Sequence, residues 1–200
     1  MVTVTIDGVE KGYEAGTPYE EIAAAYQERY DDTIALVMVD GKITELMKTL
    51  TRDCELQFVT LKNSAGHKAY VRTAIMLLIK ALYDVEPREN VERIKVEFAV
   101  GQGYYCSLKG KIRVDETLIE RLNVRMQQLV MDNVPIEKKT YPLEDGLALF
   151  DRYGMEDKKK LFRYRRSSFV NIYRMDNYYD YYYGYMLPST GYVKYFKVIS

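Results

Sequence analysis

The sequence predicts an α+β fold made of two consecutive units. Short strands with alternating apolar residues fill residues 1–62, whereas residues 67–200 combine a long apolar helix with further strands and helices. The stretch Lys62-Asn63-Ser64-Ala65-Gly66 between them is polar and small, as expected for a boundary. We therefore expect one domain at residues 1–62 and a second at residues 67–200.

The first unit carries turn and helix-start signals at short intervals. Asp7-Gly8 is typical of a hairpin turn, and Thr17-Pro18-Tyr19-Glu20 has the pattern of an N-cap, a first-turn proline and a capping box. The expected elements are strands at 2–6 and 9–13, a helix that opens at Thr17-Pro18, and strands at 34–39 and 54–61. Two strands, a helix and two further strands is the element order of the β-grasp fold.

The second unit begins with a long apolar helix over residues 68–83, which ends before Pro87. Strands at 91–100 and 104–108 follow, and we interpret Gly101-Gln102-Gly103 between them as a hairpin turn because no helix follows it to hold a phosphate. The remaining expected elements are a helix capped by Asp115, a strand at 134–141, short helices at 143–153 and 155–164, and strands at 169–175 and 192–199.

Charge and composition exclude several functional classes. The charges of the 29 basic and 29 acidic residues cancel, which argues against nucleic-acid binding that is driven by a net positive charge. No run approaches the roughly 18 apolar residues of a membrane span, and the N-terminus lacks a signal peptide pattern, so we expect a cytoplasmic protein with no membrane partner. Cys54 and Cys106 are expected to be free thiols, and His67 an exposed linker residue.

Tyrosine is the compositional anomaly, with 20 copies, eight of which fall between Tyr178 and Tyr195. These rings have two interpretations. They can line a groove that stacks a nucleobase, or they can pack a loop over a sheet with their hydroxyl groups bonded at its rim.

Several short motifs resemble the N-terminal region of threonyl-tRNA synthetases. The motifs are Leu77-Leu78 with Pro87 nine residues later, Gly103-Tyr104-Tyr105, and Arg125-Met126 in the following helix. In that family a TGS domain, which is a ubiquitin-like β-grasp, precedes a domain that edits mischarged tRNA. The resemblance covers the whole chain and implies the same two domains here.

The resemblance also implies that the editing site has lost its chemistry. The family has two histidines on the helix facing a cysteine and a histidine on a late loop, and the matching positions here are Arg72, Met76, Tyr182 and Met186. Arginine cannot ligate a cation and a thioether prefers soft copper, so we expect no metal site and no catalytic residue. The residues expected to share the remaining ligand cleft are Arg72, Met76, Tyr104, Tyr105, Asp180, Tyr182 and Met186.

Two local features keep two interpretations each. Arg72 can form a fork with a phosphate or carboxylate ligand, or a salt bridge with Asp180. The basic run can contact RNA, or it can be a solvated helix end whose cations offset the helix dipole. That run consists of Lys158, Lys159, Lys160, Arg163, Arg165 and Arg166.

A second resemblance concerns the run from Tyr179 to Tyr192, which is similar to a late motif of bacterial uridine kinase-related proteins. In that family TGS and editing-like units precede a P-loop kinase domain, but the phosphate-binding Gly-x-x-x-x-Gly-Lys-Ser/Thr is missing here. The resemblance implies a non-catalytic region, binding a small ligand or RNA, of a nucleoside kinase. Its downstream kinase domain would use ATP and Mg²⁺, and this chain itself would need no cofactor.

Two alternative functions stay open. One is a metal-free aminoacyl-tRNA deacylase that uses substrate hydroxyl groups, water and backbone amides of the pocket. The other is a structural or oligomerisation arm, which is favoured if Tyr182, Tyr185 and Met186 fill the cleft.

Overall fold

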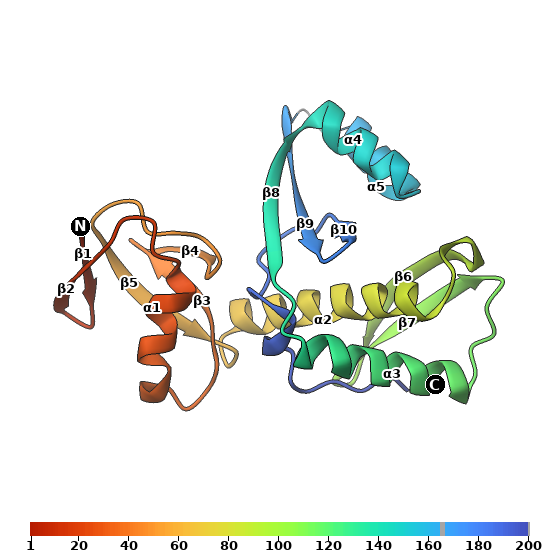
Figure 1. The fold of residues 1–200 in the computed structure, drawn as a ribbon, viewed down its shortest axis with the longest axis horizontal. Helices are drawn as coiled ribbons and strands as arrows, with labels where there is room; N and C mark the ends of the chain where they lie inside the picture. Colours follow the sequence, from red (N-terminus) through yellow and green to blue (C-terminus); the bar gives the residue numbers. More distant parts are fainter. Residues whose placement is uncertain (165–166, 200) are drawn as a thin grey trace.

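The computed structural model describes residues 1–164 and 167–199, and its architecture is mixed α and β (Figure 1). Within these residues there are three sheets with the strand orders β2-β1-β5-β3-β4, β10-β9-β8 and β6-β7. The strands are β1 (Val2–Ile6), β2 (Val9–Tyr13), β3 (Ile34–Val39), β4 (Lys42–Glu45), β5 (Cys54–Thr60), β6 (Val91–Val100), β7 (Gly103–Gly110), β8 (Ile136–Pro142), β9 (Phe169–Met175) and β10 (Tyr178–Asp180). The α-helices are α1 (Tyr19–Tyr26), α2 (Ser64–Val85), α3 (Glu116–Met131), α4 (Leu143–Arg152) and α5 (Glu156–Arg163), and the 3₁₀ helices are η1 (Gln27–Arg29), η2 (Arg88–Asn90) and η3 (Thr190–Tyr192).

The first sheet is built on two tight hairpins. Asp7-Gly8 and Asp40-Gly41 each join antiparallel strands, and all four residues have positive φ, as turns that match the strand twist require. The second hairpin creates β4, a strand that the sequence analysis did not predict because Lys42–Glu45 is short and largely polar. Within this sheet β1 pairs with β5 in parallel, and the other pairs are antiparallel.

The start of α1 differs from the predicted capping box. The helix begins at Tyr19, and the hydroxyl of Thr17 donates to the carbonyl of Glu14 instead of capping the helix. Two free amides of the first turn, those of Tyr19 and Glu20, donate to the carbonyls of Lys48 and Leu46. The loop after β4 therefore takes the role that was predicted for the Thr17 side chain.

Helix α2 connects the first sheet directly to the rest of the chain. It begins at Ser64, earlier than predicted, and the side chain of Asn63 caps it by accepting from the amide of Ala65. Gly66 packs so tightly that a Cβ there would lie 2.2 Å from the carbonyl oxygen of Thr60. The polar stretch predicted as a boundary thus forms the turn after β5 and the first turn of α2, and the division into domains at 62–67 stays a prediction.

The main core lies along α2. Helix α3 packs beside it through Leu118, Leu122, Met126 and Leu129, and Asp115 caps α3 as predicted by accepting from the amide of Leu118. The same core takes in Ala35, Leu36 and Val59 of the first sheet. A smaller cluster at the far end of β8 and β9 joins α4 to α5 through Phe150 and Phe162.

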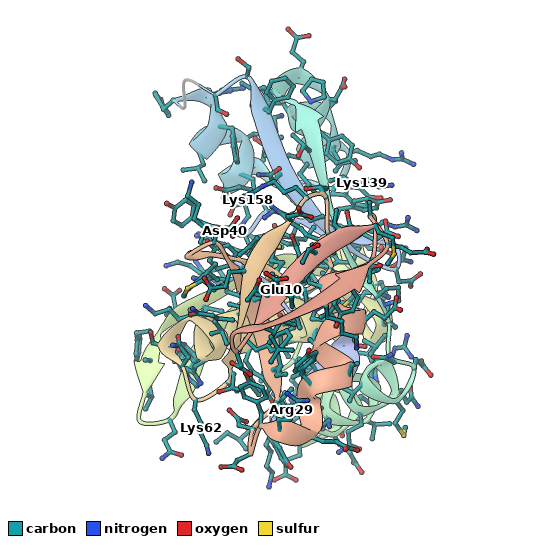
Figure 2. The ribbon with its side chains drawn as sticks, turned by 90° about the vertical axis from the view of Figure 1, so that its left-hand side faces the viewer. Glu10, Arg29, Asp40, Lys62, Lys139 and Lys158 are labelled. Atoms are coloured by element: carbon teal, nitrogen blue, oxygen red, sulfur yellow. The ribbon has the colours of Figure 1, made fainter. Side chains whose placement is uncertain are left out.

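The sheet of β8, β9 and β10 stands on one side of α2, and α3 runs along the other (Figure 1). Figure 2 shows the first sheet facing the viewer, with Lys139 and Lys158 above it in the part built from β8–β10 and α4–α5. The predicted strand at 192–199 does not form. Its backbone instead pairs with side chains, since Tyr70 bonds the backbone of Tyr195 and Asn123 bonds the backbone of Val198.

No helix in the described part of the chain combines the length and apolarity that crossing a bilayer requires.

Candidate functional site

A cavity of about 610 Å³ lies where α2, the β8–β9 pair and the loop after β10 meet. Helix α2 supplies one wall with its first three turns, and the chain from Tyr181 to Tyr185 supplies another. The described residues that line it are Ser64, Ala65, Lys68, Arg72, Lys138, Phe162, Ser167, Phe169, Val170, Asn171, Tyr181, Tyr182, Tyr183, Gly184 and Tyr185. This cavity is the candidate functional site.

The lining of the cavity is cationic and aromatic. Lys68 and Arg72 stand one helical turn apart on α2, and Lys138 reaches the cavity from β8. Like charges at this helical spacing repel each other, so the arrangement costs some folding stability. The described lining contains no carboxylate, and of the three cations only Lys138 pairs with a carboxylate, that of Glu45 behind the wall. The site can therefore hold an anion better than a cation.

Arg72 is the best-placed of these cations. Its Nη1 donates to the carbonyl of Tyr185 at 3.4 Å, and no carboxylate of the described residues lies within ion-pair distance of it. The salt bridge with Asp180 that remained open from the sequence does not form, because Asp180 pairs with Lys158 at 3.5 Å instead. A guanidinium without a carboxylate partner is available for a ligand.

Gly184 lets the backbone come close to this guanidinium. Its φ is +123°, and a Cβ at this position would lie 2.5 Å from Cζ of Arg72. Glycine is the residue that tolerates both the conformation and the contact. The loop after β10 is thereby held against the arginine.

A buried carboxylate behind the wall fixes the same loop. Glu45 of β4 is fully buried, accepts from the amide of Met186 at 3.1 Å and from the hydroxyl of Tyr173, and pairs with Nζ of Lys138 at 2.9 Å. Burial, followed by the charge of Glu45, raises the pKa of Tyr173. Sequence reasoning missed Glu45, Lys138 and Tyr173, and no local motif marks them, because they come from three strands that meet only in the fold.

Asp180 organises the tyrosines that follow β9. It is buried and accepts from the hydroxyl of Tyr178 at 2.9 Å and from the amide of Tyr181 at 2.7 Å. Burial raises the pKa of Tyr178 and of Tyr182 well above the usual range, and the charge of Asp180 adds to this. Tyr178 is buried, so it packs the loop over the sheet, which is one of the two roles predicted for these tyrosines. Tyr182 lines the cavity.

The residues predicted to share one cleft separate into three groups. Arg72 and Tyr182 line the cavity. Met76 and Met186 are fully buried in the main core, because an apolar thioether gains more from packing than from facing water, and Asp180 is buried beside the cavity. Tyr104 and Tyr105 lie on β7, outside the lining, and are 47% and 53% exposed.

The cavity is not filled in the way that a purely structural role would require. Tyr182 and Tyr185 stand in its wall, Met186 packs into the core behind them, and a volume of about 610 Å³ remains. In the described part of the chain no three His, Cys, Asp or Glu side chains gather as metal ligands. Cys54 and Cys106 are free thiols.

The predicted RNA-contacting run is partly engaged in internal ion pairs. Lys158 pairs with Asp180 at 3.5 Å, and Lys159 pairs with Asp151 and Glu156 on the surface of α4 and α5. The two cations of this run that stay exposed on the described part of α5 are Lys160 and Arg163. Arg165 and Arg166 lie outside the described residues. RNA contact through this run stays a prediction.

Comparison with known proteins finds threonine–tRNA ligases among the relatives of this chain. No protein-family model matches the chain. The chain is 30% identical over 195 residues to a threonine–tRNA ligase of Thermotoga sp. (strain RQ2), a match that covers 97% of this chain and 30% of the relative. Identity is 29% over 206 residues to the threonine–tRNA ligase of Syntrophotalea carbinolica (100% and 32%) and 23% over 202 residues to that of Clostridium kluyveri (100% and 31%).

The chain is therefore similar, along its whole length, to a region of threonine–tRNA ligases. It spans less than a third of the length of these curated relatives. This similarity supports the predicted resemblance to the N-terminal region of threonyl-tRNA synthetases as a similarity of sequence.

The predicted link to uridine and nucleoside kinases is wrong. The three relatives described above match 97% or more of the chain and are threonine–tRNA ligases, and nothing in them supports a kinase. The link rested on the tyrosine-rich run 179–192. Three tyrosines of this run, Tyr182, Tyr185 and Tyr192, pack against the main core, so their recurrence has a structural cause and is weak evidence of common descent. The downstream kinase partner, with its ATP and Mg²⁺, loses its support with that link.

Proposed function

We propose that this chain binds the single-stranded acceptor end of a transfer RNA in the cavity beside Arg72. Residues 1–62 would form the TGS-like β-grasp domain and residues 67–200 the editing-like domain of this RNA-binding region. The observation that carries the proposal is the Arg72 guanidinium, which faces an aromatic cavity with Lys68 and Lys138 nearby and has no carboxylate partner among the described residues.

The cations of the cavity suit a phosphate. Arginine presents a planar fork of donors that matches phosphate oxygens, and a charge-assisted bond of this kind is stronger than a neutral one. Lys138 is already paired with Glu45, so its charge is partly compensated, whereas Lys68 is exposed and has no ion pair among the described residues. We therefore assign Arg72 and Lys68 to the phosphate and Lys138 to the support of the wall.

The aromatic residues of the cavity suit a nucleobase. Phe169, 59% exposed, and Tyr182 stand in the same lining as Arg72. Stacking of a base on such a ring contributes about 1–3 kcal/mol and tolerates any base. A terminal nucleotide offers both groups at once, and the similarity to proteins named for tRNA makes a tRNA end the favoured source.

Binding of tRNA can be tested with labelled tRNA of the threonine type by fluorescence anisotropy. Arg72→Ala should weaken binding at least about tenfold, because a hydrogen bond to a charged group contributes about 1.5–3 kcal/mol. Arg72→Lys should recover only part of the loss if the fork geometry matters. The matched control is Arg52→Ala, since Arg52 is 69% exposed and pairs with Asp40 outside the cavity. Equal affinity of wild type and Arg72→Ala would refute the proposal.

Hydrolysis of a mischarged tRNA is a second candidate function. Arg72 and Lys68, the two cations of the cavity without a carboxylate partner among the described residues, are suited to stabilise the oxyanion that forms when an ester is cleaved. The described lining offers no carboxylate, imidazole or thiol as a general base, so a hydroxyl group of the RNA would have to assist the attacking water. Incubation with tRNA that carries a wrong amino acid distinguishes the two functions: bound but intact ester supports binding alone, and ester loss that Arg72→Ala slows supports hydrolysis.

A further inference from the structure

The outward face of the β6–β7 hairpin combines exposed aromatic and basic side chains. The strand register places Phe98 opposite Tyr105 and Arg93 opposite Lys109. Alternate residues of the strands point to opposite faces, and Ile94 and Leu108 belong to the inward set, packed against the main core. The register shift between Val96 and Phe98 brings Phe98 onto the outward face, where Glu97 bonds Lys95 and Ser107. The residues of the outward face are Arg93, Lys95, Glu97, Phe98, Val100, Tyr105, Ser107 and Lys109.

The aromatic pair on this face is open to solvent. Phe98 is 59% exposed and Tyr105 is 53% exposed, although the two rings stack with centroids 5.2 Å apart. Val100, 57% exposed, extends the apolar surface toward the tip of the hairpin. Ile94 and Leu108 pack against the main core nearer the base of the hairpin, whereas the Phe98–Tyr105 pair lies beyond that core and stays exposed.

The basic residues of this face carry an electrostatic cost. Arg93 and Lys109 are direct cross-strand neighbours, and like charges in this arrangement destabilise a sheet. Neither has a carboxylate within ion-pair distance in the described part of the chain. Glu97 faces them from the same hairpin, but it bonds Lys95 and Ser107. Residues 91–113 hold five basic and two acidic side chains, a net charge of +3 in a chain whose total is zero.

We propose that this face is a binding site for single-stranded RNA. A base would stack on the Phe98–Tyr105 pair, and neighbouring phosphates would contact Arg93 and Lys109. Rings on a strand surface can stack only bases that are not already paired, so a single strand is favoured over a duplex. The local positive charge complements a polyanion, whereas a second copy of this neutral chain would gain less from it. The site is separate from the cavity at Arg72 and does not depend on the proposed function.

The test is anisotropy of fluorescein-labelled A₁₂ and U₁₂ RNA with the full 200-residue chain. Phe98→Ser with Tyr105→Ser should weaken binding of both oligomers at least about tenfold. Arg93→Gln with Lys109→Gln should also weaken it, and should lower the slope of log K against log salt by about 1.4, or about 0.7 for each lost phosphate contact. A duplex of the same length should bind more weakly than the single strands.

Matched controls separate this site from the rest of the surface. Tyr195→Ser removes another exposed ring, 84% accessible, and Lys42→Gln with Lys48→Gln removes two exposed cations of the first sheet region. Both control variants should keep wild-type affinity for the oligomers. Wild-type affinity of folded hairpin variants, checked by circular dichroism, would overturn the proposal. So would a loss of dimer by light scattering in those variants without any change in RNA binding, because it would assign the face to self-association.

Discussion

The backbone amide of Met186 donates to Oε1 of Glu45 at 3.1 Å, across 141 residues of sequence. The acceptor lies at the end of β4 in the first sheet, and the donor follows directly on the loop that lines the cavity. The hydroxyl of Tyr173 bonds the same carboxylate and lies 2.7 Å from the carbonyl oxygen of Gly184. Gly184 and Met186, the two ends of this short loop segment, are therefore both held near the buried carboxylate of Glu45. The first sheet thereby positions the wall of the candidate site.

Removal of the Glu45 carboxylate should destabilise the fold and loosen this loop. Glu45→Ala would leave Lys138 without its partner and the Met186 amide without an acceptor. Loss of one member of a buried ion pair costs about 3–5 kcal/mol, and we expect the lower end because Lys138 is 21% exposed. Urea unfolding measures the change in free energy.

Two further variants make the Glu45 prediction specific. Glu45→Gln with Lys138→Met removes both charges and should recover part of the loss, since no charge is then left unpaired. Glu55→Ala removes an exposed carboxylate of strand β5 in the same sheet and should change the free energy of unfolding by less than about 0.5 kcal/mol. A loss as large in Glu55→Ala as in Glu45→Ala would contradict the assigned role.

Gly184→Ala should move Arg72 and thereby weaken whatever the cavity binds. Alanine at φ +123° is strained, and its Cβ would overlap the guanidinium. Gly154→Ala is the matched control, because Gly154 also has positive φ, +65°, but has no atom within 4 Å of the added Cβ. Unfolding measurements on Gly184→Ala, Arg72→Ala and the double variant should give a coupling of about 0.5–3 kcal/mol. Additive effects would mean that the two residues do not press on each other.

Local sequence signals predicted the elements well where the cause of an element is local. Asp7-Gly8 and the Asp115 cap act within a few residues, and both occur in the structure as expected. The strand predicted at 192–199 fails for the opposite reason. Its backbone is satisfied by the side chains of Tyr70 and Asn123, which lie 125 and 75 residues away, and an alternating pattern cannot reveal such partners.

The sequence predicted only some of the residues of the candidate site. Arg72 and Tyr182 were found because a family resemblance gave their positions, and both line the cavity. The same resemblance placed Met76 and Met186 in the cleft, but their side chains prefer the core once no metal needs a ligand. Lys138 and Glu45 could not be found, because their pairing depends on how β4 and β8 meet in space.

Stability should fall at alkaline pH because several tyrosines are buried in their neutral form. Burial raises the pKa of Tyr173, Tyr178 and Tyr182 above the ordinary value of 10.0. The folded protein then holds protons that the unfolded chain releases, so this stabilisation is complete below about pH 10 and is lost as the pH rises through 10 toward the folded-state pKa values. Urea unfolding at pH 8, 9.5 and 10.5 measures this fall in the free energy of unfolding.

Tyr178→Phe identifies the source of that decline. Phenylalanine keeps the packing but loses the hydroxyl bond to Asp180, so the variant should be less stable than wild type at pH 8. The variant has one ionisable group fewer, so its free energy of unfolding should fall less steeply with pH. The plots of unfolding free energy against pH for wild type and variant should therefore converge at pH 10.5. Parallel curves would mean that buried tyrosines do not set the alkaline limit. Tyr164→Phe, at an 89% exposed position, should follow wild type throughout.

The segment after η3 should detach when its side-chain partners are removed. The hydroxyl of Tyr70 donates to the carbonyl of Tyr195 at 2.7 Å and accepts from the backbone amide of Tyr195 at 2.8 Å. The side-chain amide of Asn123 likewise donates to the carbonyl of Val198 and accepts from its backbone amide, both at 2.9 Å. Tyr70→Phe with Asn123→Leu removes all four bonds while keeping apolar volume. Each bond contributes about 0.5–1.5 kcal/mol, so amide hydrogens of residues 193–199 should exchange at least about tenfold faster. Because α2 and α3 pack through other residues, exchange within these helices should stay unchanged, and faster exchange there as well would show global destabilisation instead of local release.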